Sequence, residues 1–151
     1  RQSLRAAIPT IISQIVQNKK KIKLGSLTPR RDFTFVSDTV DGFISAISNK
    51  KCLGQAINLG TGQDFSIGET LNMIKKILNK DIEVVTDHVR VRPKKSEVNR
   101  LLSSNLKAKK YLNWAPLYKG KKGYEKGLKE TIKWFSEGEN IKIYKSNIYN
   151  Y

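Results

Sequence analysis

The sequence predicts a mixed α/β fold with few, short strands, and three observations lead to that prediction. Residues 28–47 change their apolar period from two, at Phe33 and Phe35, to about 3.6, which indicates a strand that runs into a helix. Helical stripes alternate with short strand-like segments along the chain, an order typical of α/β proteins. The 151 residues suffice for a core, but a free-standing parallel sheet needs more strands. We therefore expect a lobe built on a larger fold.

The apolar periods and the turn residues place the individual elements. The expected strands cover residues 22–24, 30–36, 55–59 and 82–85. The expected helices lie within residues 1–18, 37–49, 66–79, 105–112 and 124–136. Ser37 or Asp38 is the expected N-cap of the second helix, and Ser66 with Glu69 forms a capping box for the third. Residues 87–104 are expected to be irregular, and residues 138–151 show no clear period.

The strongly basic composition has two explanations. The formal charge is +16, with 29 Lys and Arg against 13 Asp and Glu. Seven of the cations are Arg, and the Lys residues occur in short pairs scattered among Asn and Ile. A nucleic-acid interface usually gathers its cations on one face and interleaves Arg with aromatic residues. We therefore interpret the lysines as solvated surface and keep nucleic-acid binding as the lesser alternative.

Composition also limits the expected location of the protein. Cys52 is the only cysteine, so no internal disulfide can form, as expected of a reducing cytoplasm. No apolar run approaches the length of about 20 residues that a membrane helix needs. The first residues show no signal-peptide pattern and no initiating Met. We expect a cytoplasmic chain that begins within a longer protein.

Two motifs suggest chemistry, but neither has the required context. Gly60-Thr61-Gly62 lacks the third glycine of a dinucleotide loop, because that position is Phe65, so we interpret the glycines as a tight turn. Tyr118 and Lys122 have the spacing of an acid/base pair on a helix, but nearby glycines and a proline predict a loop. A single His and the absence of a His/Cys cluster argue against zinc. The sequence predicts no catalytic centre or metal site of its own.

Two arginines are the leading candidates for anion binding. Arg31 is expected where a strand meets the following helix, a place where backbone and guanidinium groups often hold phosphate. The alternative for Arg31 is an ion pair with Asp32 or Asp38. Arg92 lies in an irregular segment after a strand, and loops on a rigid scaffold often carry ligand contacts. The alternative for Arg92 is an ordinary solvated charge.

A series of segments, in order, resembles one known family. These segments are Arg1-Gln2-Ser3 with Ile8-Pro9-Thr10, Ile22-Lys23-Leu24-Gly25, Arg31-Asp32-Phe33 to Asp38, Ile57 to Gly62 with Ser66-Ile67, Arg92-Pro93 with Ser96-Glu97-Val98, Lys107 to Pro116, and Gly127 to Phe135. Together they resemble the C-terminal, substrate-binding part of extended short-chain dehydrogenases/reductases, the NAD-dependent epimerase/dehydratase family. The chain looks most similar to nucleotide-sugar 4,6-dehydratases, and among these it resembles a branch acting on UDP-N-acetylglucosamine.

The resemblance implies roles for six residues. Arg31 and Arg92 are expected to grip the diphosphate of a nucleotide sugar, and Ser66 to lie beside the phosphates. Leu24, with Ala7 and Ile22 near it, is expected to line the base pocket. In the family, the glycine-rich NAD loop and the Tyr-x-x-x-Lys pair precede the segment that corresponds to residue 1. The resemblance thus implies that NAD binds the parent enzyme and not this chain alone, which is expected to be inactive by itself.

The resemblance also implies an organisation and a set of partners. Residues 1–137 are expected to form the substrate-binding lobe, without the N-terminal Rossmann core, and residues 138–151 a tail that is disordered or packed on an absent surface. The expected partners are a nucleotide-diphosphate sugar, the N-terminal NAD-binding half and, in the parent, a second copy in a homodimer. The alternatives are a non-catalytic nucleotide-sugar binding module and, less favoured, a nucleic-acid-binding domain.

Overall fold

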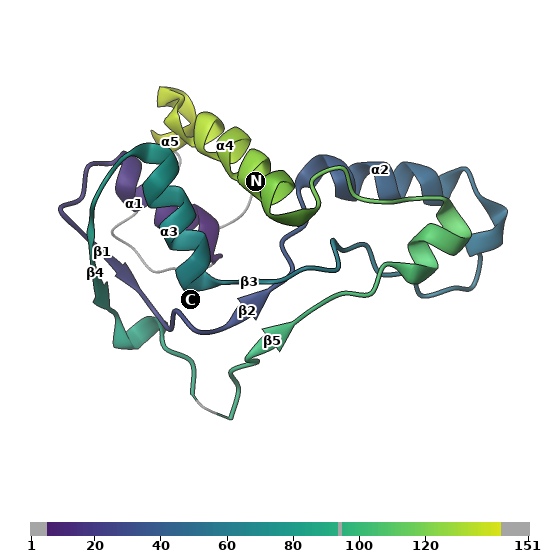
Figure 1. Cartoon of the computed structure of the whole chain (residues 1–151), viewed down its shortest axis with the longest axis horizontal. Coiled ribbons are helices and arrows are strands. Elements are labelled where there is room, and N and C mark those ends of the chain that lie inside the picture. The colour runs from purple at the N-terminus through teal and green to yellow at the C-terminus, as the bar shows by residue number, and fades with distance from the viewer. Residues whose placement is uncertain (1–5, 94, 143–151) are drawn as a thin grey trace. The chain divides into compact units, whose positions relative to one another are not determined.

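The computed structural model describes residues 6–93 and 95–142 (Figure 1). The chain folds as two compact units, which we describe separately. Unit 1 consists of Arg1–Pro29, Ser66–Asn99 and Leu128–Tyr151, and unit 2 of Arg30–Phe65 and Arg100–Gly127. Helix α4 (Gly120–Ser136) supplies its first residues to unit 2 and the remainder to unit 1.

Unit 1 is built on two parallel strands and their helices. Strand β1 (Lys21–Leu24) pairs with β4 (Glu83–Thr86), from Lys21 opposite Glu83 to Leu24 opposite Thr86. Helices α1 (Ala7–Val16) and α3 (Ile67–Leu78) lie beside the strands (Figure 1). The buried apolar residues of these elements are Ile11, Ile12, Ile15, Ile22, Leu24, Leu71, Ile74 and Ile82. Local signals thus placed β1, β4 and α3 correctly within one or two residues, and α1 lies inside the predicted range 1–18.

The two edges of β1 are satisfied in different ways. One edge pairs with β4, and the Leu24 carbonyl continues the pairing by accepting from Asp87 N at 2.8 Å. On Lys23, the backbone N–H donates to Gln14 Oε1 at 2.8 Å, and the carbonyl accepts from Gln14 Nε2 at 3.1 Å. The Gln14 amide therefore occupies the place that a third strand would take.

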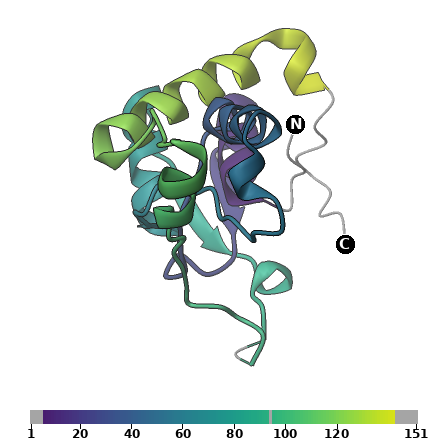
Figure 2. The same cartoon turned by 90° about the vertical axis from the view of Figure 1, so that its right-hand side faces the viewer.

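Unit 2 is built from two-residue strands and short helices. Strand β2 (Arg30–Arg31) pairs in parallel with β5 (Arg100–Leu101), in a sheet ordered β3-β2-β5, where β3 is Phe65–Ser66. Helix α2 (Val36–Ile47) is followed by the 3₁₀ turn η1 (Lys50–Cys52), and the π-helix η3 (Ala108–Leu112) completes the unit. Figure 2 views α2 along its axis, with η3 beside it.

The core of unit 2 gathers small and aromatic side chains. Ala108, Leu112 and Trp114 form a buried cluster, and the residues packed against it are Ala46, Cys52, Ile57 and Leu59. Gly42 allows Leu59 to lie against α2, since a Cβ at position 42 would come within 2.4 Å of the Leu59 side chain. The inner face of α2 is therefore built from small residues.

The predicted strand at 30–36 and its helix cap were partly wrong. The strand ends at Arg31, and α2 begins at Val36 with Phe35 as an N-cap that makes no side-chain bond. Asp38 does not cap the helix. Its carboxylate is 1% exposed and accepts from Leu117 N and Tyr118 N at 2.9 and 3.0 Å. Because the carboxylate bonds to the distant loop at Leu117 and Tyr118, it is not available to cap its own helix.

Three other element predictions need correction, and most of the predicted tail lies outside the described residues. Residues 55–59 form no strand, because no neighbouring strand lies beside them in the described part of the chain. Helix α4 begins at Gly120, so the loop predicted around Lys122 is helical there, with Tyr118 just outside it. The segment 87–104 contains the short η2 (His88–Arg90) and β5. In the tail, Gly138–Lys142 form helix α5, and 143–151 lie outside the described residues.

Candidate functional site

The turn after β4 is fixed at several points in unit 1. The Asp87 carboxylate accepts from Val89 N at 3.1 Å and from Arg90 Nε at 3.0 Å. Gly25, which follows β1, passes so close that a Cβ there would lie 2.5 Å from the Arg90 carbonyl oxygen. The end of β1 and the turn His88–Arg90 therefore form one closely packed corner.

Arg92 follows this corner by two residues. Its side chain is exposed, and none of the residues that the structure describes forms a hydrogen bond or ion pair with it. A guanidinium offers up to five N–H donors in a planar fork that suits phosphate oxygens. Both interpretations of Arg92, a solvated surface charge and a phosphate ligand, are compatible with an exposed side chain. The role of Arg92 therefore stays a prediction.

Ser66 caps helix α3 as predicted. Its Oγ accepts from Glu69 N at 2.9 Å, and Ser66 N donates to Glu69 Oε2 at 2.7 Å, which completes the capping box. The next two helix amides are also used, because Ile67 N donates to the Pro29 carbonyl and Gly68 N to the Leu27 carbonyl. The helix N-terminus is therefore closed to an anion by its own chain, and the hydroxyl hydrogen of Ser66 is the donor left for a phosphate.

The residues predicted for the base pocket pack in unit 1. Ile22 is fully buried and Leu24 is 4% exposed, both on the same face of β1. Ala7, the first residue of α1, is half-buried. The side chains of Ile22 and Leu24 thus stabilise the core, and any contact with a base stays a prediction.

Arg31 lies in unit 2, whereas the other five predicted residues lie in unit 1. Its Nη1 donates to the Arg30 carbonyl at 2.8 Å. The two carboxylates proposed as alternative partners both accept hydrogen bonds from backbone N–H groups. Asp38 accepts the two backbone N–H groups described above, and Asp32 accepts from Thr61 N at 3.0 Å and Gly62 N at 2.9 Å.

A buried carboxylate that pairs with Arg30, the residue before Arg31 in the chain, was not predicted. Asp64 Oδ1 accepts from Arg30 Nε at 2.8 Å, and its other oxygen accepts from Arg100 Nε. The Asp64 side chain is 6% exposed, and the hydrogen bonds from Arg100 and Arg30 lower the pKa of this carboxyl below its ordinary value. The ion pairs connect β2 to β5 and so fix the backbone that carries Arg31. No spacing in the sequence announces them, because the partners are 34 and 36 residues apart.

The turn Gly60-Thr61-Gly62 behaves as expected. Its amides donate to Asp32, and Gly62 has a positive φ of 74° with open space around it. A dinucleotide loop needs such amides for the pyrophosphate, and here they are already engaged. The turn therefore lacks free amides for a pyrophosphate, and the expectation that NAD does not bind this chain alone stays a prediction.

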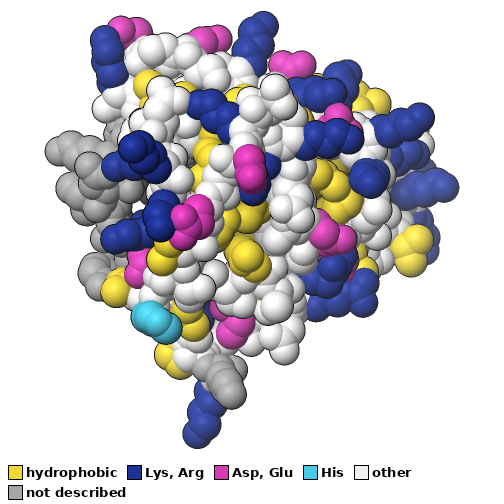
Figure 3. Space-filling view, turned by 60° about the vertical axis from the view of Figure 1, so that its left-hand side comes forward, with side chains coloured by type: hydrophobic (Ala, Val, Ile, Leu, Met, Phe, Trp, Pro, Cys, Tyr) yellow, Lys and Arg dark blue, Asp and Glu magenta, His cyan; other side chains and the backbone are white. Residues whose placement is uncertain are grey.

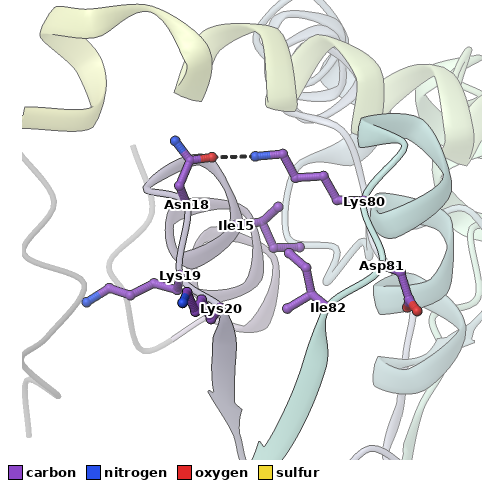
Figure 4. A pocket seen from close by; sticks show the side chains of 7 residues that line it. All are labelled: Ile15, Asn18, Lys19, Lys20, Lys80, Asp81 and Ile82. Carbon is purple, nitrogen blue, oxygen red and sulfur yellow. Dashed lines mark hydrogen bonds between the residues drawn. The ribbon is translucent and has the colours of Figure 1, made fainter.

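A shallow pocket of about 260 Å³ lies in unit 1 at the C-terminal ends of α1 and α3 (Figure 4). Lys19, Lys20 and Lys80 line it, and Lys80 Nζ donates to Asn18 Oδ1 at 2.5 Å. Cations at helix C-termini complement the helix dipole. We interpret this pocket as a site of helix capping and not of ligand binding.

The described residues also bear on metal binding and membrane insertion. In that part of the chain, no three His, Cys, Asp or Glu side chains are grouped so that they could hold a metal ion. Likewise, none of the helices there has both the length and the apolarity that a membrane crossing requires.

Comparison with known proteins identifies the family. Residues 1–127 match the sequence profile of the family described as GDP-mannose 4,6 dehydratase. The chain is 32% identical over 137 residues to a UDP-N-acetyl-alpha-D-glucosaminuronate decarboxylase of Bacillus cytotoxicus, a match that covers 88% of this chain and 40% of that protein. The chain belongs to this family of extended short-chain dehydrogenases/reductases, the NAD-dependent epimerases and dehydratases.

Solved structures agree with that assignment. An epimerase from Methanothermobacter thermautotrophicus has a TM-score of 0.77 and 29% identity, covering 91% of this chain and 39% of its own. A UDP-glucuronic acid 4-epimerase variant from Bacillus cereus, in complex with UDP-4-deoxy-4-fluoro-glucuronic acid and NAD, has a TM-score of 0.73 and 26% identity, covering 95% and 41%. The predicted α/β class is confirmed. The chain spans about 40% of the length of these relatives.

Proposed function

We propose that this chain provides the nucleotide-sugar-binding portion of an NAD-dependent nucleotide-sugar dehydratase or epimerase. In this proposal Arg31 and Arg92 bind the diphosphate and Ser66 donates to a phosphate oxygen. Leu24, Ile22 and Ala7 border the base. The observation that carries the proposal is the family match over residues 1–127, because it includes all six of these positions.

Local features support the two arginines as diphosphate ligands. Each is attached to a segment fixed by side-chain hydrogen bonds: Arg31 beside the Asp64 ion pairs, and Arg92 beyond the Asp87 corner. Such preorganisation lowers the entropy lost when a flexible cation binds phosphate. A sugar nucleotide of the UDP-N-acetylglucosamine kind is the proposed ligand.

The chemistry belongs to the proposed parent enzyme. There NAD would supply hydride transfer, and the chain described here would orient the sugar nucleotide for it. The proposal assigns no catalytic step to the residues of this chain. We further propose a cytoplasmic parent that forms a homodimer.

Calorimetric titration with UDP-N-acetylglucosamine, UDP and GDP tests the proposal. We expect saturable binding that weakens about 10- to 100-fold in Arg31→Ala and Arg92→Ala, the loss expected for one charge-assisted phosphate contact. Lys76→Ala, which removes an exposed cation from α3, is the matched control and should bind as the wild type does. Equal affinity in all four proteins would contradict the assignment of the arginines.

Two alternatives predict different results in further titrations, one with an NAD-binding body added and one with oligonucleotides. A non-catalytic nucleotide-sugar module is favoured by the engaged amides at Gly60-Thr61-Gly62, and it would bind with unchanged affinity whether or not an NAD-binding body is present. A nucleic-acid-binding domain would instead bind oligonucleotides with a steep dependence of affinity on salt. The face shown in Figure 3 carries Lys and Arg at scattered positions with Asp and Glu among them, which does not favour that alternative.

A further inference from the structure

Helix α4, drawn in green to yellow in Figure 1, carries four lysines at successive intervals of four, three and four residues. An α-helix places side chains at this spacing within an arc of about 60° and along about 16 Å of its axis. All four side chains are exposed, and we call the set the α4 lysine row: Lys122, Lys126, Lys129 and Lys133. The buried residues of the same helix lie on a different side of it, and they are Tyr124, Leu128, Ile132 and Phe135.

The cations of the chain are unevenly distributed among its helices. Helices α1 and α2 contain no Lys or Arg and α3 contains two, whereas the 17 residues of α4 contain five Lys and two Glu. Lysines that only keep the surface solvated would be shared among the helices. Their concentration on α4 therefore indicates a local requirement for positive charge.

The first turn of α4 indicates the same requirement. Lys121 and Lys122 occur there, and the turn contains no acidic residue. The helix dipole makes the N-terminus the positive end of a helix, so cations at this end destabilise it. Selection for stability alone would favour Asp or Glu at these positions. A role outside the fold accounts for lysines that the helix itself does not favour.

The chemistry of the α4 lysine row favours an anionic lipid surface as its partner. The apolar side of the helix is already buried, so α4 cannot insert it between acyl chains and can attract a membrane only by charge. A lysine is a flexible point charge without the planar fork of an arginine, which suits headgroups that move freely. A nucleic-acid interface would interleave Arg with aromatic residues, and α4 contains no Arg.

We propose that the α4 lysine row holds this protein at the surface of membranes that contain anionic phospholipids. The ammonium groups lie among the headgroup phosphates, and no part of α4 enters the hydrocarbon. Each lysine near such a surface raises the affinity about fivefold, so the loss of four should weaken binding by about 100-fold or more. None of the four is among the six residues proposed for nucleotide-sugar binding, so the two proposals fail independently.

Co-sedimentation of the full chain with lipid vesicles tests this proposal. One set of vesicles is phosphatidylcholine with about one third phosphatidylglycerol, and the other is phosphatidylcholine alone. The row variant replaces all four lysines by Gln, which is also a good helix former. The matched control removes the same charge from exposed lysines on other elements, by K50Q, K51Q, K76Q and K109Q. Circular dichroism checks that all three proteins are folded.

We expect the wild type and the control to bind the anionic vesicles with affinities within about threefold of each other, because charges beyond the screening length contribute little. The row variant should bind about 100-fold more weakly or less still, and phosphatidylcholine alone should bind none of the proteins. Salt of about 0.5 M should release the wild type, because charge alone holds it.

Four results would overturn the proposal. Equal losses in the row variant and the control would show that only the net charge of the protein matters. Absence of binding to the anionic vesicles would remove the partner, and binding that persists in high salt would indicate insertion in place of surface attraction. Tighter binding to a duplex oligonucleotide, lost in the row variant and kept in the control, would make a nucleic acid the partner.

Discussion

Replacement of Asp38 by Asn should destabilise unit 2 strongly although the side chain keeps its shape. The wild-type carboxylate accepts two backbone N–H groups, from Leu117 at 2.9 Å and Tyr118 at 3.0 Å, and is 1% exposed. Hydrogen bonds to a charged group each contribute about 1.5–3 kcal/mol. An Asn can accept one of these N–H groups but turns its own NH₂ toward the other. We therefore expect the free energy of unfolding to fall by about 2–3 kcal/mol.

Urea unfolding followed by tryptophan fluorescence measures this loss. Trp114 reports on the region directly, because its Nε1 donates to the Asp38 carbonyl at 3.0 Å. A Trp134→Phe background leaves Trp114 as the single tryptophan. The matched control is Asp41→Asn on the exposed side of the same helix, which should change stability by less than about 0.5 kcal/mol. Equal stability of the two variants would refute the buried carboxylate as the anchor of the 117–118 loop.

Three further predictions concern the ion pairs, a cap and a close contact. Because Arg100 and Arg30 lower the pKa of Asp64 below its ordinary value of 3.8, its stabilisation is present above that pH and is lost as pH falls through the lower folded pKa. The urea midpoint of Asp64→Asn should therefore depend less on pH below about pH 5 than that of the wild type, and parallel curves would contradict this. Ser66→Ala should cost about 0.5–2 kcal/mol in thermal unfolding, whereas Ser66→Asn should retain most of the cap; equal losses would argue against capping. Gly25→Ala places a Cβ 2.5 Å from the Arg90 carbonyl oxygen and should cost about 1–3 kcal/mol in chemical denaturation. A neutral effect there would mean that the turn moves freely.

Local sequence signals predicted unit 1 better than unit 2. The predicted capping box of Ser66 and Glu69 is confirmed. Its two residues are three positions apart, so the local sequence alone contains the signal. Strand β1 was predicted from the alternation of apolar and polar residues, and helix α1 from apolar residues at helical spacing. Both patterns indicate which side of the element is buried. Such patterns need no knowledge of distant segments.

Prediction was less accurate where distant segments decide the structure. Asp38 has the right residue type for an N-cap, but a loop 79 residues away takes its carboxylate. The ion pair of Asp64 with Arg100 was not predicted either, because its partners are 36 residues apart in the sequence. Segment 55–59 has a strand pattern, yet a strand is defined by its neighbour, and the described part of this chain supplies none there. Of the six predicted site residues, the structure describes the surroundings of all, and their ligand contacts stay predictions.

The Gln14 amide against Lys23 has a consequence for how the protein behaves in a crowded solution. A side-chain amide can terminate hydrogen bonding along an edge but cannot pass it on to a further strand. The two-stranded sheet of unit 1 is therefore finite, and β1 offers no template on which other chains could polymerise as a cross-β stack. The polypeptide thus blocks further strand pairing at this edge with one uncharged side chain.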